Sequence, residues 1–420
     1  MQKFDVLIVG AGMVGLSLAL ALRKNTDLKI AIADTLPVNN LTPAPEVRVS
    51  AINVASKTFF DNLNVWSDIE ATRLQPYQKM HIWDKDGVGK LDFSVDDLAN
   101  FPKNENLGWI IENTVIRNAL WQKAQADEGI SFFVDHKLAS ITEGESEIFV
   151  SFEATSDTHK GIQAPLITKL VVGADGANSW VRQQTALPII SRDYDHHAIV
   201  ATVKCTQSHK NTAWQVFLPT GPLAFLPLFP EDNATCSIVY STSPEEAKRL
   251  TALNAVDFAK ELTAASDGKL GNIELISERY TYPLTMRLAQ DFVKGSVVLI
   301  GDAAHTIHPL AGQGVNLGLL DAAALAQTIT SLVQNTQDKN LASSQVLKAF
   351  SRARKSDATE MIAAMEAIKQ TFSVQQSGIK LLRGIGLSLL NNIKPAKKVL
   401  IEQALGLKSD LPKLSKSKLN

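Results

Sequence analysis

The sequence contains very little cysteine: only Cys205 and Cys236 occur among its 420 residues. The two lie far apart in the chain and in no CxxC pair, which excludes a disulfide-rich scaffold and gives no zinc-binding spacing. We therefore expect two buried, reduced thiols, because a free cysteine behaves as a small apolar side chain.

The sequence also lacks an excess of charge of one sign. Its 42 Lys and Arg stand against 43 Asp and Glu, a formal net charge of -1, so it has no basic excess with which to bind nucleic acid. Long apolar runs are missing as well: Met13–Leu22 is shorter than the ~18 residues of a membrane span, and no basic segment precedes it. A composition with 45% hydrophobic and 20% charged residues is typical of a globular enzyme. We predict a cytoplasmic location.

The opening of the chain contains a strand, a glycine-rich turn and a helix in close succession. Lys3–Val9 reads as a buried strand, and an apolar helix follows to Leu22. Between them stands the turn Gly10-Ala11-Gly12-Met13-Val14-Gly15. A second strand, Lys29–Ala33, closes on Asp34. This order is the one that a dinucleotide-binding fold requires.

Each of three glycines has a physical task in such a turn. Gly10 permits the tight bend, Gly12 lets the backbone approach a pyrophosphate, and Gly15 lets helix and strand pack closely. The helix N-terminus then presents amides and a positive dipole end to the phosphates. Asp34 stands where a carboxylate can accept hydrogen bonds from ribose hydroxyls, and its charge disfavours a 2'-phosphate. A fortuitous glycine turn is the alternative, and the flanking strand, helix and acid count against it.

Two further buried strands run into turns of small residues. The first, Leu170-Val171-Val172, continues as Gly173-Ala174-Asp175-Gly176-Ala177-Asn178-Ser179-Trp180-Val181-Arg182. The second, Val297-Val298-Leu299-Ile300, continues as Gly301-Asp302-Ala303-Ala304-His305-Thr306-Ile307-His308-Pro309-Leu310-Ala311-Gly312-Gln313-Gly314-Val315-Asn316-Leu317-Gly318. Glycine and aspartate at a strand end also form plain turns without a ligand. The density of small residues before an arginine-bearing helix, in the first of the two, is nevertheless unusual.

The three motifs together resemble the class A flavoprotein aromatic hydroxylases, the family that includes para-hydroxybenzoate hydroxylase. They occur in the family's order and cover most of the chain. More narrowly, the segment His308–Gly318 is similar to that of the ubiquinone-biosynthesis hydroxylases, most closely those that act on 2-polyprenylphenol. The resemblance implies FAD as cofactor and NAD(P)H as a transient reductant, since no second GxGxxG motif occurs.

The resemblance also implies a set of cofactor-binding residues: Gly10, Ala11, Gly12, Met13, Val14, Gly15, Asp34, Arg48, Ser50, Ala51, Glu112, Arg117, Asp175, Arg182, Asp302, Gly312, Gly314, Val315 and Asn316. Within it, the first glycine turn would hold the pyrophosphate, and Asp34 the adenosine ribose. Arg48 would lie near the flavin, although a plain surface arginine is the default interpretation. Glu112 and Arg117 would be helix residues at the adenosine end. Asp175 and Arg182 would shape the place where NAD(P)H and flavin meet, and Asp302 would bind the ribityl chain.

Chemical reasoning agrees with an oxygen-transferring flavin site. Reduced flavin carries negative charge, and the amides of Gly314, Val315 and Asn316 at a helix start would stabilise it. We predict no metal, because His305 and His308 lack a third ligand. For catalysis we name His308, as a proton relay for a phenol, and Pro309, beside the isoalloxazine ring. A structural role for both histidines is the alternative.

We predict an α/β fold: a Rossmann-like FAD-binding domain of the glutathione-reductase type, with an inserted antiparallel-sheet substrate domain and a C-terminal helical segment. Residues 1–75, 100–183 and 284–375 would form the FAD domain, 76–99 and 184–283 the substrate domain, and 376–420 the helical, basic tail. Within these, helices are expected over Trp109–Ala126, around Pro244–Ala264 and over Gly378–Gly406, and a small antiparallel meander over Glu143–Lys169. The apolar run Pro222–Phe229 suits a greasy substrate and equally suits the core of any sheet.

The resemblance implies that the protein hydroxylates the ring of a polyprenylated phenol or quinol in ubiquinone biosynthesis, with O2 and NAD(P)H, through a flavin hydroperoxide. Alternatives are hydroxylation of another aromatic substrate, a flavin-dependent halogenase or prenyl reductase, and a non-catalytic prenyl-binding relative. Residues 378–420 carry nine Lys and Arg against two Asp and Glu. A basic, amphipathic end can contact the inner face of the membrane or an assembly of the pathway. A packed helix with a solvated basic tail is the other interpretation, and we expect Lys408–Asn420 to be frayed.

Overall fold

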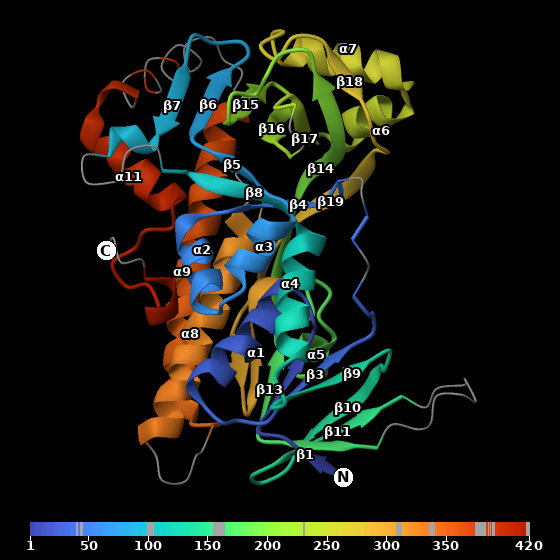
Figure 1. Ribbon diagram of the computed structural model, residues 1–420, viewed down its shortest axis with the longest axis vertical. Helices are drawn as coiled ribbons and strands as arrows, with labels where there is room; N and C mark the ends of the chain where they lie inside the picture. Colours follow the sequence, from blue (N-terminus) through green and yellow to red (C-terminus); the bar gives the residue numbers. More distant parts are fainter. Residues whose placement is uncertain are drawn as a thin grey trace.

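A parallel β-sheet forms the centre of the lower half of the molecule in Figure 1. The computed structural model describes residues 1–38, 41–42, 45–98, 105–153, 164–229, 232–307, 313–335, 341–373, 384, 386, 388 and 391–416. The sheet has the order β20-β21-β13-β2-β3-β9, and only β20 runs antiparallel to its neighbour. Its strands are β20 (Val293–Lys294), β21 (Val297–Leu299), β13 (Leu170–Gly173), β2 (Val6–Val9), β3 (Ile30–Asp34) and β9 (Ile130–Val134). Strands β2, β13 and β21 are buried along their whole length, as continuous apolar runs predict for a sheet covered on both faces.

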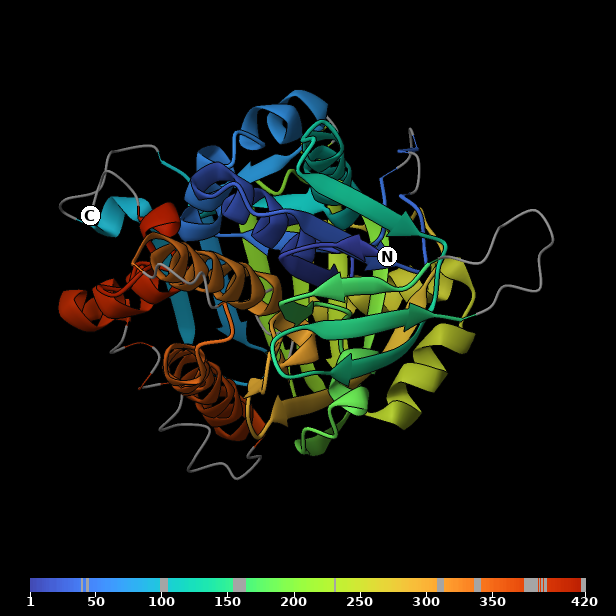
Figure 2. The ribbon, with the colours of Figure 1, turned by 90° about the horizontal axis from the view of Figure 1, so that it is seen from below.

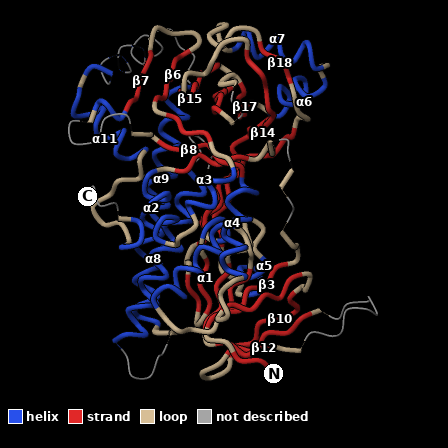
Figure 3. The backbone as a smooth tube through the Cα atoms, viewed as in Figure 1, coloured by secondary structure: helices blue, strands red, loops and turns tan. Residues whose placement is uncertain are grey.

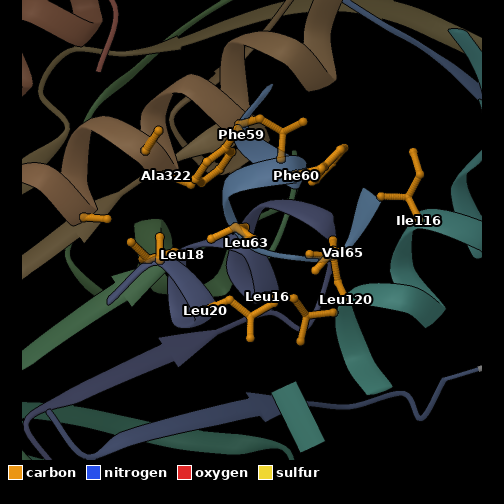
Figure 4. Close-up of a cluster of buried hydrophobic side chains, with 14 of the residues drawn as sticks. Leu16, Leu18, Leu20, Phe59, Phe60, Leu63, Val65, Ile116, Leu120 and Ala322 are labelled. Carbon is orange, nitrogen blue, oxygen red and sulfur yellow. The ribbon is translucent and has the colours of Figure 1, made fainter. Parts of the chain in front are cut away.

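Helices cover one face of this sheet (Figures 1 and 3), whereas a small, mostly antiparallel sheet covers much of the other face, together with α5 (Trp180–Gln184) and part of α9 (Ser344–Ser373). The helices on the first face and packed around it are α1 (Met13–Asn25), α2 (Val54–Asn62), α3 (Trp66–Thr72), α4 (Asn113–Gln125) and α8 (Gln313–Asn335). Figure 4 shows the core around α1, which is built from Leu16, Leu18, Leu20, Phe59, Phe60, Leu63, Val65, Ile116, Leu120 and Ala322. Helix α8 is long and apolar enough to span a membrane by composition, but 67% of its apolar window is buried inside the protein. It is therefore a core helix, and it packs against α1.

A four-stranded sheet lies at the lower end of the molecule (Figures 1 and 2). Its order is β1 (Gln2–Lys3), β12 (Leu166–Thr168), β11 (Ile148–Phe152) and β10 (Leu138–Glu143). The antiparallel pairs β10–β11 and β11–β12 form the meander that the alternating pattern predicts, although it begins five residues earlier than expected.

The upper half of Figure 1 is a nine-stranded, mostly antiparallel sheet. In order, its strands are β22 (His305–Thr306), β19 (Tyr280–Ala289), β14 (Ile189–Cys205), β17 (Thr235–Thr242), β16 (Gly221–Pro227), β15 (Thr212–Leu218), β6 (Lys79–Asp84) and β7 (Lys90–Ser94), with β18 (Ile273–Leu275) paired to β14. Helices α6 (Pro244–Ala252) and α7 (Ala255–Ala265) pack on its outer face, so two helices replace the single predicted one. The division of the chain into domains at the predicted residue bounds stays a prediction.

Both cysteines are free and buried, as predicted. They lie on the neighbouring strands β14 and β17, where Cys236 stands opposite Val203. The two thiols are hydrogen-bonded to each other. Distance along the chain therefore gave no indication of their proximity in space.

A three-stranded sheet connects the two halves, in the order β4 (Val49–Ile52), β8 (Gly108–Glu112) and β5 (Gln75–Tyr77). It corrects the predicted helix over Trp109–Ala126, because Trp109 to Glu112 form β8 and the helix α4 begins only at Asn113. All four residues from Trp109 to Glu112 are buried, and their strand pairs with β4 on one edge and with β5 on the other. A buried apolar run of that length fits a strand as well as a helix.

The C-terminal part of the chain folds back onto the lower half. Helix α11 (Lys394–Ala404) is followed by a segment whose Leu405 and Leu411 are buried. Asn62 of α2 donates to the Leu414 carbonyl at 2.8 Å, and Lys413 N donates to Gln327 of α8 at 2.8 Å. The expected fraying from Lys408 onward is therefore wrong as far as residue 416.

Candidate active site

The predicted glycine turn lies at the carboxyl end of β2, between β13 and β3 and next to the start of α1. Gly10 has φ +108°, and a Cβ there would lie 2.4 Å from the Ala174 carbonyl oxygen. A Cβ on Gly15 would lie 2.1 Å from the Gly10 oxygen, so both positions need glycine to let strands and helix approach. Around Gly12 nothing lies within 4 Å of such an atom, which leaves open space where a pyrophosphate would lie.

The N-terminus of α1 is free to bind an anion. Gly12 is its N-cap, no side chain caps the helix, and the first turn contains no acidic residue. The first amides of a helix have no partner inside the helix and carry the positive end of its dipole. The structure therefore fits the phosphate-binding role of Gly10, Gly12 and Gly15.

Asp34, at the end of β3, lies beside this turn. Its carboxylate accepts from the amide of Ala11 at 2.7 Å and from the amide of Leu36 at 3.0 Å. Arg117 of α4 donates to the Ala11 carbonyl at 2.8 Å and lies 3.9 Å from Asp34. The structure thus brings Asp34 and Arg117 together at the side of the turn where an adenosine ribose is expected.

Asp302 follows β21 on a turn whose first residue, Gly301, has φ +59°. The side chain of Asp302 is accessible, yet protein atoms crowd around its carboxylate, and this burial raises its pKa, an effect that His305 partly offsets. A carboxylate in this place can accept hydrogen bonds from the hydroxyls of a ribityl chain.

The start of α8 lies next to both turns. A Cβ on Gly318 would lie 2.9 Å from a methyl group of Val14 and 3.1 Å from the Cα of Gly301, so α8, α1 and the Asp302 turn meet here. Asn316 is only 2% exposed. Its side-chain amide donates to the Ala51 carbonyl at 2.8 Å, and its side-chain oxygen accepts from Asn53 N at 3.2 Å. These bonds fix the amides at the start of α8, which include the predicted Gly314 and Val315, relative to β4.

Asp175 and Arg182 belong to the turn after β13. One oxygen of Asp175 accepts from Val181 N at 3.1 Å, and the other is buried without a partner. Burial raises the pKa of Asp175 and lowers that of Arg182. Arg182 donates to the carbonyls of Ala303 at 2.7 Å and Ala177 at 2.9 Å. It therefore ties this motif to the Asp302 turn.

The remaining predicted residues near the flavin lie on or next to β4. Arg48 is exposed, donates to the Tyr282 hydroxyl at 3.3 Å and lies over that ring, so it joins β4 to the large sheet. Ser50 donates to the side chain of Asn113 at 2.7 Å. A cofactor role for Arg48, Ser50 and Ala51 stays a prediction.

Glu112 has a structural partner that the sequence did not indicate. It is the last residue of β8 and the N-cap of α4, not a residue within the helix. Both of its oxygens accept from Arg73, at 2.6 and 2.7 Å, and Glu46 N donates to it at 2.7 Å. The carboxylate therefore holds α3 and the chain before β4, and its predicted role at the adenosine end stays a prediction.

The predicted catalytic residues His308 and Pro309, and Gly312, lie outside the described residues. His305 is described and is fully buried, with its Nε2 2.5 Å from Asp321 of α8. Within the described ranges no group of three His, Cys, Asp or Glu side chains could hold a metal ion.

Sequence reasoning missed Asp321 and Arg354. Arg354 Nε lies 2.7 Å from an Asp321 oxygen, and both side chains are buried. A signal for Asp321 existed, since it is the one acidic residue within the apolar helix between Gly314 and Val333. Its partner in α9 could not be identified from the sequence, because the two are 33 residues apart.

These features together fit FAD. The residues that would hold it lie at the carboxyl ends of β2, β3 and β21, which is where ligands bind in open α/β sheets, and at the start of α8. The start of α1 would hold the pyrophosphate, Asp34 the adenosine ribose, Asp302 the ribityl chain, and the start of α8 the negative end of the reduced ring.

Comparison with known proteins agrees with this geometry. Residues 3–364 match the family described as FAD binding domain. The 3-demethoxyubiquinol 3-hydroxylase of Escherichia coli (strain K12) is 33% identical over 407 residues, 97% of this chain and 99% of that protein. The mitochondrial ubiquinone biosynthesis monooxygenase COQ6 of Xenopus tropicalis is 31% identical over 442 residues, 94% of this chain and 91% of that protein. The crystal structure of p-nitrophenol 4-monooxygenase PnpA from Pseudomonas putida shares the fold, with a TM-score of 0.76 at 18% identity over 96% of this chain and 99% of that one.

The chain therefore belongs to the FAD-binding family of flavin-dependent monooxygenases that hydroxylate aromatic rings. It is an enzyme that uses FAD, NAD(P)H and O2, and over nearly its whole length it aligns with hydroxylases of ubiquinone biosynthesis. Bound FAD would supply the activation of O2 for ring hydroxylation, with NAD(P)H as the reductant. In this arrangement the start of α1 and Asp302 would hold the cofactor, and the amide dipoles at the start of α8 would lie against its negative charge.

Proposed function

We propose that this enzyme hydroxylates the ring of a polyprenylated phenol or quinol in ubiquinone biosynthesis. The observation that carries the proposal is full-length similarity to two ubiquinone-pathway hydroxylases, at 33% and 31% identity, in a chain whose flavin-binding turns are all present. One of these relatives is named for 3-demethoxyubiquinol and its ring position 3, whereas the third motif resembles enzymes of 2-polyprenylphenols. The ring carbon is therefore left to experiment.

The inner face of the large sheet supports the proposal, because two of its apolar side chains are only half-buried. On the outer face Leu223 and Phe225 of β16 are fully buried under α6 and α7. On the inner face Leu226 of β16 and Met80 of β6 are only half-buried, and both pack against the core of the lower half.

One row of that inner face runs across six strands. By the strand register it contains Phe93, Met80, Ala213, Leu226, Ser237 and Thr202. The row is apolar at one end, while the hydroxyls of Ser237 and Thr202 are buried without partners at the other. Such a wall suits a ring with a polar edge and a prenyl chain. Within Pro222–Phe229, the residues of β16 that face outward thus belong to the core of the sheet, whereas those that face inward are available for a greasy substrate.

The proposal is tested with purified holoenzyme, a short-chain 2-polyprenylphenol, NAD(P)H and ¹⁸O2. We expect one ¹⁸O atom in the product ring and reductant consumption that depends on the phenol. The same assay with 4-hydroxybenzoate, which has no prenyl chain, is the control. Equal turnover of both rings, or oxidation of the reductant without ring labelling, would contradict the proposed substrate. Neither result would contradict the assignment of the protein as an FAD-dependent enzyme.

We further propose that α11 contacts the inner face of the membrane. Ile393, just before the helix, and Val399 within it are 46% and 60% exposed, and Lys394 and Lys398 beside them are exposed as well. Apolar and basic side chains on one helix bind anionic lipid surfaces. In cosedimentation with vesicles, Val399→Glu should reduce binding to anionic lipid. The equally exposed Val256→Glu on α7, at the opposite upper side of Figure 1, should not, and equal loss in both variants would contradict the proposal.

A further inference from the structure

Asp321 of α8 lies at the centre of a buried hydrogen-bond network. One of its oxygens accepts from Gly301 N at 2.9 Å and lies 2.5 Å from His305 Nε2. The other accepts from Arg354 Nε at 2.7 Å. The Asp321 and His305 side chains have no exposed surface, and that of Arg354 is 7% exposed. Three partners on one buried carboxylate make a geometrically defined arrangement, in which both Asp321 oxygens are bonded while Nδ1 of His305 and one terminal nitrogen of Arg354 are buried without a partner.

The network holds both ends of the turn that carries Asp302. Gly301 precedes Asp302 and is held through its backbone, whereas His305 follows it and is held through its side chain. From the opposite side, Arg182 donates to the carbonyl of Ala303 within the same turn. Asp302 itself contributes no bond to this network and keeps its accessible side chain.

Asp321 belongs to the same helix as the amides expected at the flavin ring. Gly314, Val315 and Asn316 lie in the first turn of α8, about two turns before Asp321. A bond between Asp321 and the Gly301 turn therefore fixes the distance between Asp302 and the start of α8. Arg354, from α9, supplies the opposite charge that makes a carboxylate acceptable in this interior.

We propose that Asp321, paired with Arg354, is a positioning residue for the flavin half of FAD: it locks the Asp302 turn to α8 so that the ribityl chain and the ring are bound by one rigid unit. The adenosine half lies outside its influence, because Asp34 bonds to Ala11 and Leu36 and not to the members of this network. FAD affinity should thus depend on Asp321, and affinity for ADP should not.

The test compares FAD and ADP binding to the full-length apoprotein. In Asp321→Asn we expect the Kd for FAD, measured by quenching of flavin fluorescence, to rise more than tenfold. The Kd for ADP, measured by calorimetry, should stay within twofold of the wild type. Asp357→Asn is the matched control, since Asp357 also pairs with Arg354 but does not touch the Gly301 turn; its Kd for both ligands should stay within twofold.

Asp321→Asn leaves Arg354 without its buried partner, and this variant can fail to fold for that reason. A second variant avoids the problem. Asp321→Asn combined with Arg354→Met removes both charges and restores a neutral interior, and the same selective loss of FAD affinity is expected. The proposal is overturned if either foldable variant binds FAD within twofold of the wild type. It is equally overturned if FAD and ADP weaken together, since that indicates a general structural defect, or if Asp357→Asn weakens FAD as strongly.

Discussion

Gly10 and Gly12 stand two residues apart in one turn, and the structure gives them different constraints. Gly10 combines a left-handed φ with a backbone carbonyl 2.4 Å from where a Cβ would lie, whereas Gly12 faces open space. The first glycine is therefore needed to build the fold, and the second is needed only when the cofactor approaches.

This contrast predicts different defects for two alanine variants. Gly12→Ala should keep the melting temperature of the apoprotein within about 2 °C and raise the Kd for both FAD and ADP at least tenfold, because the new methyl group lies in the pyrophosphate's place. Gly10→Ala should destabilise the apoprotein itself, by about 2 kcal/mol or more. Calorimetry of both apoproteins and ligand titrations check this. A stable Gly10→Ala protein, or normal FAD binding by Gly12→Ala, would contradict the distinction between the two glycines.

The pKa of Asp321 predicts a dependence of stability on pH. Burial alone would raise this pKa, but His305 and Arg354 bring it below its usual range. A lowered folded-state pKa means that the carboxylate stabilises the fold above the usual aspartate pKa of about 4, and that this contribution is lost as the pH falls through the folded-state value. At pH 7, Asp321→Asn should therefore lower the free energy of unfolding by about 3–5 kcal/mol.

Urea denaturation of the two apoproteins from pH 7 to pH 3 measures this difference. It should begin to narrow below pH about 4, where the carboxyl of the unfolded chain binds a proton, and should vanish only as the pH falls through the lower folded-state pKa. A difference that stays constant over the whole range would show that the charge of Asp321 does not stabilise the fold.

At the residue scale, the sequence predicts what depends on local chain geometry. The glycines of the first turn and Asp34 are within one strand–turn–helix unit, so their spacing is informative, and the structure brings them together. The partners of Glu112 and Asp321 are Arg73 and Arg354, each more than 30 residues away. Such pairs follow from tertiary packing, and no local pattern encodes them.

At the scale of elements, the side chains of β16 alternate between the core of the sheet and the proposed substrate wall, since successive side chains of a strand point to opposite faces. Phe225 faces α6 and α7 and is fully buried, whereas Leu226 faces inward and is half-buried. Phe225→Ala should cost about 3–5 kcal/mol of stability.

Leu226→Gln, by contrast, should change the melting temperature by less than about 2 °C and raise the KM for a prenylated phenol severalfold with little change in kcat, because it removes apolar contact with the substrate. Steady-state kinetics and thermal unfolding of both variants check this pair. An unchanged KM in Leu226→Gln would show that this side chain of β16 does not contact the substrate.

The C-terminal segment after α11 is an element that the sequence did not predict. Its basic composition suggested a solvated end, yet Leu411 is buried beside Ala55 and Leu320. One of its charged groups has two partners in α9, since Lys408 pairs with Asp357 and Glu360. A few apolar residues therefore hold this segment against α2 and α8, although many of its other residues are charged.

Truncation after Gly406 should therefore destabilise the protein, because it exposes the surface of α2 and α8 that Leu411 and Leu414 cover. We expect the melting temperature to fall by several degrees, as about 1–3 kcal/mol would produce. Truncation after Lys416 is the control and should have no such effect. Equal stability of both truncated proteins would show that the docked segment contributes nothing.

Buried strands were the easiest elements to predict, because a short apolar run between turn residues fits few structures besides a buried strand. β3, β13 and β21 lie within one residue of the predicted segments, and β2 ends where predicted but begins at Val6 and not at Lys3. β8 was mistaken for the first turn of α4, since an apolar run next to a helix has the same residue types in either state. Only the pairing of this segment with β4 and β5 shows that it is a strand.

At the scale of the whole molecule, the site exists because three distant segments meet. The turns after β2, β13 and β21 come from residues near 10, 175 and 302, and the parallel sheet places them side by side (Figure 1). Above them lies the inner face of the nine-stranded sheet. We therefore place the flavin in the lower half, and the substrate ring against the sheet of the upper half.

The most direct test of the central claim is the lipid profile of the host after deletion of the gene. Quinones and their precursors in a lipid extract are measured by mass spectrometry. We predict that a polyprenylated ring lacking one hydroxyl group accumulates, that the wild-type gene clears it, and that an Asp302→Ala version does not. An unchanged quinone profile in a host without a second copy of this activity, or full rescue by Asp302→Ala, would contradict the proposed function.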